Sequence, residues 1–99
     1  MTDTLMLVGS LSNDLFRVAS LAQRGSGQAA TRFLLEAKRW SGDLEKKQVA
    51  PYILRIAKNI SARENSDISM DSAEEYLMYG VLLQNYALHS IGKNFGSEN

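Results

Sequence analysis

The feature that most constrains this chain is the spacing of its apolar residues, which recur every three or four positions along most of its length. This spacing lines up apolar side chains on one face of an α-helix. Glycines at Gly25, Gly42 and Gly92 divide the pattern into four segments, and there is little of the alternation typical of strands. We therefore predict an all-α protein, a compact and largely antiparallel bundle of about four helices, in a single domain over residues 1–99.

The first two predicted helices cover residues 3–24 and 28–40. Gly25 stands where helices often end in a left-handed residue, and Ser26 is a suitable N-cap for the second helix. Gly42 is expected just past the end of the second helix. Because the connection between the two helices is so short, they should be antiparallel. Their apolar faces comprise Val8, Leu11, Leu15, Val18 and Ala22 in the first helix, and Ala30, Phe33, Leu34, Ala37 and Trp40 in the second.

The start of the third helix has two interpretations. Pro51 suits the first turn of a helix, which would place residues 43–48 in a polar loop. Alternatively, the helix begins at Asp43 and continues through Pro51 with a kink. The first interpretation is preferred, and residues 63–69 are predicted to form a loop. The expected core face consists of Ile53, Ile56, Ala57 and Ile60.

The fourth helix is predicted over residues 71–91, as the longest and most buried of the four. Asp71 or Ser72 can cap it, because each is followed three residues later by a glutamate. The sequence is apolar on nearly every side between Tyr76 and Leu88, which indicates burial. Residues 93–99 are polar and contain glycine, so a frayed tail is expected.

Composition limits the chemistry that the chain can perform. There is no cysteine, and His89 is the single histidine, so we predict no metal centre, no cofactor and no catalytic residues. The N-terminal residues lack a signal-peptide pattern, which favours a cytoplasmic protein. The longest apolar stretch, residues 76–83, is far shorter than the ~20 residues that cross a membrane, so no membrane association is expected.

Charge is balanced overall but distributed unevenly. The 11 basic and 11 acidic residues give a net charge of zero. Residues 28–63 nevertheless have a net charge of +5, and residues 64–99 have a net charge of −5. These two halves can neutralise each other within one chain or between two chains.

An aromatic stripe on the fourth predicted helix is the first candidate site. Tyr76, Tyr79, Leu83 and Tyr86 recur at spacings of three and four. Tyrosines suit interfaces as well as the edges of a core, because a large apolar ring carries a polar hydroxyl. The stripe is therefore either a contact surface for another protein or a second copy, which would give a homodimer, or simple core packing.

The basic middle segment is the second candidate site. Arg55, Lys58 and Arg63 share the polar side of the third predicted helix. A surface of this kind can contact phosphates, so nucleic-acid binding through residues 32–63 is the principal alternative function.

The third candidate site surrounds His89, in the run His89-Ser90-Ile91-Gly92-Lys93. This run resembles the phosphoacceptor motif of histidine-containing phosphotransfer domains, which are four-helix bundles, except that the glycine and the basic residue are in reversed order. The resemblance implies a phosphotransfer-like role for His89, and a small-ligand pocket between helices is a related alternative. Because no set of catalytic side chains is recognisable, we favour a non-enzymatic protein-interaction or regulatory domain that acts through apolar and aromatic helix faces.

Overall fold

The computed structural model describes residues 2–96, with side chains described for residues 4–90, and this part of the chain is all-α. It contains the predicted four helices: α1 (Thr2–Gln23), α2 (Gly27–Leu44), α3 (Pro51–Ser61) and α4 (Met70–Gly96). None of these helices is both long enough and apolar enough to cross a membrane. The predicted fold class is confirmed.

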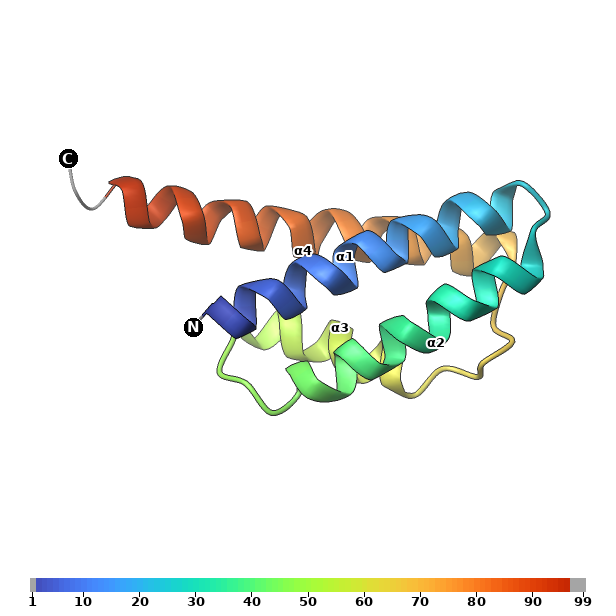
Figure 1. The fold of residues 1–99 in the computed structure, drawn as a ribbon, viewed down its shortest axis with the longest axis horizontal. Coiled ribbons are helices and arrows are strands. Elements are labelled where there is room, and N and C mark those ends of the chain that lie inside the picture. The colour runs from blue at the N-terminus through green and yellow to red at the C-terminus, as the bar shows by residue number, and fades with distance from the viewer. Residues whose placement is uncertain (1, 97–99) are drawn as a thin grey trace.

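The four helices form an elongated bundle in which α1 packs against both α4 and α2, and α2 packs against α3 (Figure 1). Successive helices are antiparallel, and α4 runs antiparallel to α1. The bundle measures 47 × 24 × 18 Å. Its long dimension follows α4, whose 27 residues extend for about 40 Å and whose last turns pass beyond the N-terminal end of α1.

The core forms where the predicted apolar faces meet. Val8, Leu11, Leu15 and Val18 of α1 are completely buried, and they belong to one cluster with the buried residues of the other three helices. The whole predicted face of α3 is also buried. Among the predicted α2 residues, Phe33 and Trp40 lie at the edge of the core and are partly exposed.

Gly25 ends α1 in the predicted manner. Its φ is +80°, a left-handed conformation that glycine adopts without steric cost. The amide of Ser26 donates to the carbonyl of Leu21 at 2.9 Å, and that of Gly25 donates to the carbonyl of Ala22 at 3.1 Å. These two bonds are the Schellman arrangement, which satisfies the last carbonyls of the helix and turns the chain back along α1.

The ends of α2 differ from the prediction. Ser26 occupies the N-cap position, but its side chain makes no capping hydrogen bond. Gly42 lies inside the helix, which continues to Leu44. A glycine inside a helix costs only about 1 kcal/mol, and burial of Leu44 against the core favours the additional turn.

The third helix starts at Pro51, as in the preferred interpretation, so the alternative of one kinked helix is wrong. The connection covers residues 45–50 and begins two residues later than the predicted polar loop, because Asp43 and Leu44 belong to α2. Residues 63–69 are non-helical, as expected.

The fourth helix is the longest, as predicted, but its cap and its burial differ from the prediction. The cap is Ser69 rather than Asp71 or Ser72, because the Oγ of Ser69 accepts the amide N–H of Ser72 at 3.0 Å. The helix continues past Ile91 to Gly96, and residues 97–99 of the predicted tail lie outside the described residues. Where burial is described, α1 buries eight residues and α4 only five, because α4 packs closely against α1 alone.

Candidate binding groove

The seam between α3 and α4 is open. Close helix packing joins α4 to α1 and α3 to α2, but it does not join α3 to α4. A hollow lies between these two helices. Its walls include Tyr52, Arg55 and Lys58 from α3, and Tyr79 and Leu82 from α4.

A second hollow extends this seam toward the C-terminal part of α4. It is lined by Tyr52, Asn85, Tyr86, His89 and Ser90. The rings of Tyr52 and Tyr86 meet edge to face, with their centroids 6.1 Å apart. Because Tyr52 lines both hollows, they form one surface feature, which we call the α3–α4 groove.

The chemistry of the groove is aromatic, amide and basic. Three tyrosines line it, together with the amide side chains of Asn59 and Asn85 and the positive groups of Arg55 and Lys58. None of the described residues that line it carries a carboxylate. The α3–α4 groove therefore offers apolar contact area, hydrogen-bonding groups and positive charge to a ligand.

The structure divides the predicted aromatic stripe between the core and this groove. Tyr76 and Leu83 are completely buried and cannot contact a partner. The hydroxyl of the buried Tyr76 has a hydrogen-bond partner, because its O–H donates to the carbonyl of Asp67 at 2.7 Å. Tyr79 and Tyr86 are partly exposed and line the α3–α4 groove.

Between residues 77 and 90, the large apolar side chains that α4 exposes are different residues. Leu77, Val81 and Leu88 form one row along the helix, and Met78 and Leu82 form the adjacent row. Each side chain is between 37% and 59% exposed. We call these five residues the outer face of α4. Sequence analysis missed it because an apolar sequence on all sides of a helix does not show which side the rest of the bundle covers.

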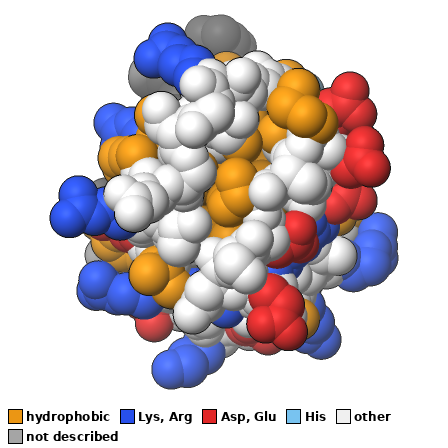
Figure 2. Space-filling view, turned by 90° about the vertical axis from the view of Figure 1, so that its right-hand side faces the viewer, with side chains coloured by type: hydrophobic (Ala, Val, Ile, Leu, Met, Phe, Trp, Pro, Cys, Tyr) orange, Lys and Arg blue, Asp and Glu red, His pale blue; other side chains and the backbone are white. Residues whose placement is uncertain are grey.

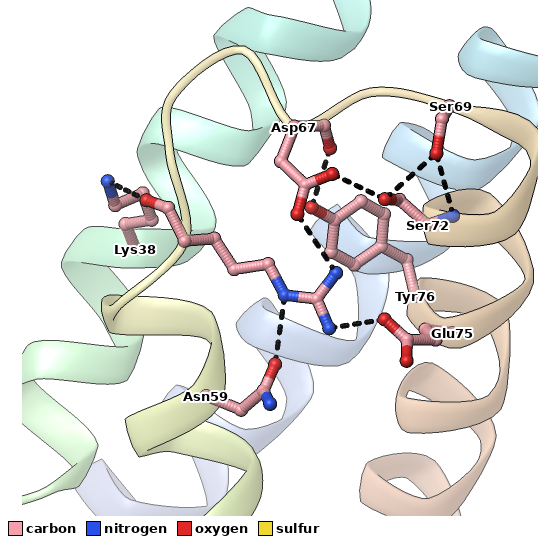
Figure 3. A network of polar contacts seen from close by, with 8 residues as sticks. Lys38, Asn59, Asp67, Ser69, Ser72, Glu75 and Tyr76 are labelled. Atoms are coloured by element: carbon pink, nitrogen blue, oxygen red, sulfur yellow. Dashed lines mark hydrogen bonds and ion pairs between the residues drawn. The ribbon is translucent and has the colours of Figure 1, made fainter.

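Arg63, predicted as a phosphate contact, instead holds the α3–α4 connection in place. Its partners Asn59, Asp67 and Glu75 are labelled in Figure 3. Its guanidinium lies 2.5 Å from a carboxylate oxygen of Glu75 and 3.3 Å from one of Asp67. It also donates to Asn59 at 2.9 Å and lies over the ring of Tyr76. The Arg63 side chain is only 10% exposed, so it is not available to an external phosphate.

Further hydrogen bonds fix the same connection. Lys38 of α2 donates to the carbonyl of Arg63 and to the side chain of Asn65, each at 2.6 Å. Ser72 donates to Asp67, and Ser69 caps α4. This network is structural, because its polar groups satisfy one another (Figure 3).

The network also shows how far the two oppositely charged segments neutralise each other. Arg63 belongs to the basic segment, and both of its ionic partners belong to the acidic one, so part of the neutralisation occurs within one chain. On the face drawn in Figure 2, the two kinds of charge lie mostly apart. In Figure 2, acidic side chains gather along the right-hand edge of the molecule, whereas most Lys and Arg side chains lie along its left and lower edges.

A buried carboxyl, missed by sequence analysis, lies between α1 and α2. Asp14 is 3% exposed and accepts a hydrogen bond from the indole Nε1–H of Trp40 at 2.9 Å. Loss of hydration raises the pKa of Asp14 to about 7, and the neighbouring Glu36 carboxylate adds to the rise. The hydrogen bond from Trp40 and the positive charge of Arg17 both lower the pKa of Asp14 and so oppose this rise. Helical spacing is the sequence signal that could have identified Asp14 as buried. Asp14 lies four residues before Val18, at the edge of the core face of α1.

His89 is exposed at one end of the α3–α4 groove, beside Tyr52 and Tyr86. The described residues hold no group of three or more His, Cys, Asp or Glu side chains that could bind a metal ion.

Comparisons of this chain with protein-family models, with curated proteins and with solved structures found no match.

Proposed function

We propose that this protein is a non-enzymatic interaction domain that binds another protein through the outer face of α4 and the adjoining α3–α4 groove. The observation that carries the proposal is the exposure of five large apolar side chains on one helix of a 99-residue chain. Together they expose on the order of several hundred Å², the size at which an apolar patch commonly marks an interaction site.

The arrangement of the bundle supports this proposal. In a closed four-helix bundle, each helix packs against two neighbours, and its exposed side is mostly polar. Here α4 packs closely against α1 alone, and apolar residues continue onto its outer surface. Covering that surface with a partner would remove it from water, which favours association by about 25 cal/mol for each Å² before the entropic cost of binding.

The test compares two leucines with the same exposure. Leu77 on the outer face of α4 and Leu35 on α2 are each 43% exposed. We would make Leu77→Lys and Leu35→Lys and capture partners from host lysate with each tagged protein. Quantitative mass spectrometry would measure recovery, and circular dichroism would confirm that both variants remain folded.

We expect Leu77→Lys to lose a specific partner that the wild-type protein and Leu35→Lys both retain. A lysine within an apolar contact must be desolvated without a counter-charge, which should reduce recovery at least tenfold. Equal recovery by both variants would show that the outer face of α4 is not the contact surface.

A further inference from the structure

We propose that the α3–α4 groove binds an acidic amphipathic helix of the partner protein, with the apolar side of that helix on Tyr79 and Leu82 and its carboxylates beside Arg55 and Lys58. The inference rests on the proposed function, because it names the kind of segment that the interaction domain would recognise. The length of the groove, its uncompensated positive charge and its apolar walls support this assignment.

The length of the groove suits a short helix. On the α4 side it extends from Tyr79 to Ser90, which corresponds to about 17 Å of helical rise. A docked helix of about three turns covers that distance. Such a helix places apolar residues at positions i, i+3, i+4 and i+7 in the groove, the usual way in which an amphipathic helix is recognised.

The charge of the groove is what specifies an acidic partner. Arg55 and Lys58 are one helical turn apart and exposed. Within the described part of the chain, neither side chain makes a hydrogen bond or an ion pair, in contrast to Arg63, whose charge is compensated by Glu75 and Asp67. Carboxylates placed beside Arg55 and Lys58 would supply the missing complementary charge and fix the orientation of the helix.

The floor and walls of the groove favour a partly apolar ligand. Ile56 is nearly buried at its base, and Leu82 forms part of one wall. The tyrosines Tyr52, Tyr79 and Tyr86 add ring area for apolar contact and hydroxyls that can bond with carboxylates. An acidic peptide with one apolar side can contact the apolar ring area with that side and bond to the tyrosine hydroxyls with its carboxylates.

Nucleic acid fits the same surface less well. A nucleic-acid site commonly contacts about six or more phosphates, and the groove offers only Arg55 and Lys58 for that purpose. The exposed residues Asp71, Glu74 and Glu75 in the first turns of α4 would repel a long polyanion that continued past the groove. A helix of three turns ends before it reaches them.

The experiment uses defined probes and charge reversal. The first probe is a fluorescein-labelled 11-residue peptide, about three helical turns, with leucine at the apolar positions of a helix and glutamate at the flanking positions. The second is the same peptide with lysine in place of glutamate, and the third is a labelled single-stranded 20-nucleotide DNA. Anisotropy would be measured with wild-type protein, with the Arg55→Glu/Lys58→Glu variant, and with Arg32→Glu/Lys46→Glu as a control that reverses two exposed charges outside the groove.

We expect the glutamate peptide to bind wild-type protein and the control at least tenfold more tightly than the lysine peptide does. The Arg55→Glu/Lys58→Glu variant should reverse this preference. An unchanged preference in that variant, or binding of DNA but neither peptide, would overturn the inference. So would self-association of the unliganded protein that the groove variant abolishes, because the occupant would then be a second copy.

The two proposals fail in different ways. If Leu77→Lys loses its partner from lysate while the groove variant binds both peptides as the wild type does, the interaction domain stands and the acidic-helix inference is wrong. If Leu77→Lys and Leu35→Lys recover the same proteins, the proposed function itself is wrong, whatever the peptides do.

Discussion

Replacing Asp14 by asparagine should change how the stability of this protein depends on pH. The Asp14 carboxyl is buried between α1 and α2, faces Glu36 and Arg17, and accepts a hydrogen bond from Trp40. Its pKa is raised from 3.8 to about 7, first by loss of hydration and then by Glu36. The folded protein therefore keeps a proton on Asp14 at pH values where the unfolded chain has released it.

The sign follows from linkage between protonation and folding. The stability that protonated Asp14 contributes is fully present below pH 3.8 and is lost as the pH rises through about 7. Each pKa unit corresponds to about 1.4 kcal/mol, so the complete loss is about 4 kcal/mol. Between pH 5 and pH 8, the loss should be about 3 kcal/mol, a large part of the 5–15 kcal/mol typical of a small domain.

Asparagine removes the titration but retains an oxygen that can accept the Trp40 hydrogen bond. We expect Asp14→Asn to be more stable than the wild type at pH 8, with the difference shrinking by about 3 kcal/mol as the pH falls to 5. Glu36→Gln should produce a smaller change in the same direction, because it removes only the neighbouring carboxylate. Asp43→Asn, at an exposed position on α2, is the matched control.

The assay is urea unfolding followed by circular dichroism at pH 5, 6, 7 and 8. The quantity of interest is the free energy of unfolding of each variant minus that of the wild type. A difference for Asp14→Asn that stays constant over this range would refute the reasoning, since it would mean that Asp14 titrates alike in the folded and unfolded states.

Two other predictions concern packing. A Cβ added to Gly80 would lie 2.8 Å from the ring of Phe16, whereas one added to Gly9 meets no atom within 4 Å. Gly80→Ala should therefore destabilise the protein by about 1 kcal/mol, although alanine has the better helix propensity. Gly9→Ala should stabilise it by up to about 1 kcal/mol. Equal changes in the free energy of urea unfolding for the two variants would contradict this reasoning. The Oγ of Ser41 is buried without a hydrogen-bond partner in the described structure, so Ser41→Ala should raise the free energy of unfolding by about 1 kcal/mol. A lower thermal midpoint for Ser41→Ala would count against that assignment.

Much of the local structure was predictable from the sequence because its causes are local. The periodic apolar faces of α1 and α3, the left-handed turn at Gly25 and the start of α3 at Pro51 each depend on residues within one or two helical turns. The errors at helix ends have another origin. Burial of Leu44 by the rest of the bundle extends α2 past Gly42. Ser69 caps α4, although Asp71 and Ser72 are also residue types that can make a capping hydrogen bond.

The candidate site could be predicted only in part. Tyr79, Tyr86, Arg55 and Lys58 were singled out from the sequence in two separate hypotheses, and the structure brings them to one groove. Arg63 appeared equivalent to Lys58 in the sequence, but its ion pairs with Glu75 and Asp67 hold its side chain in a largely buried position.

The sequence by itself determined which segments are helical, because helix formation depends on periodicity, turn residues and proline, which are properties of neighbouring positions. The tertiary structure decided which side of α4 is covered. That helix is apolar nearly all round, so its own sequence favours no single direction toward the core. Packing against α1 buries Tyr76 and Leu83, and the distance from α3 leaves the outer face of α4 and the groove exposed.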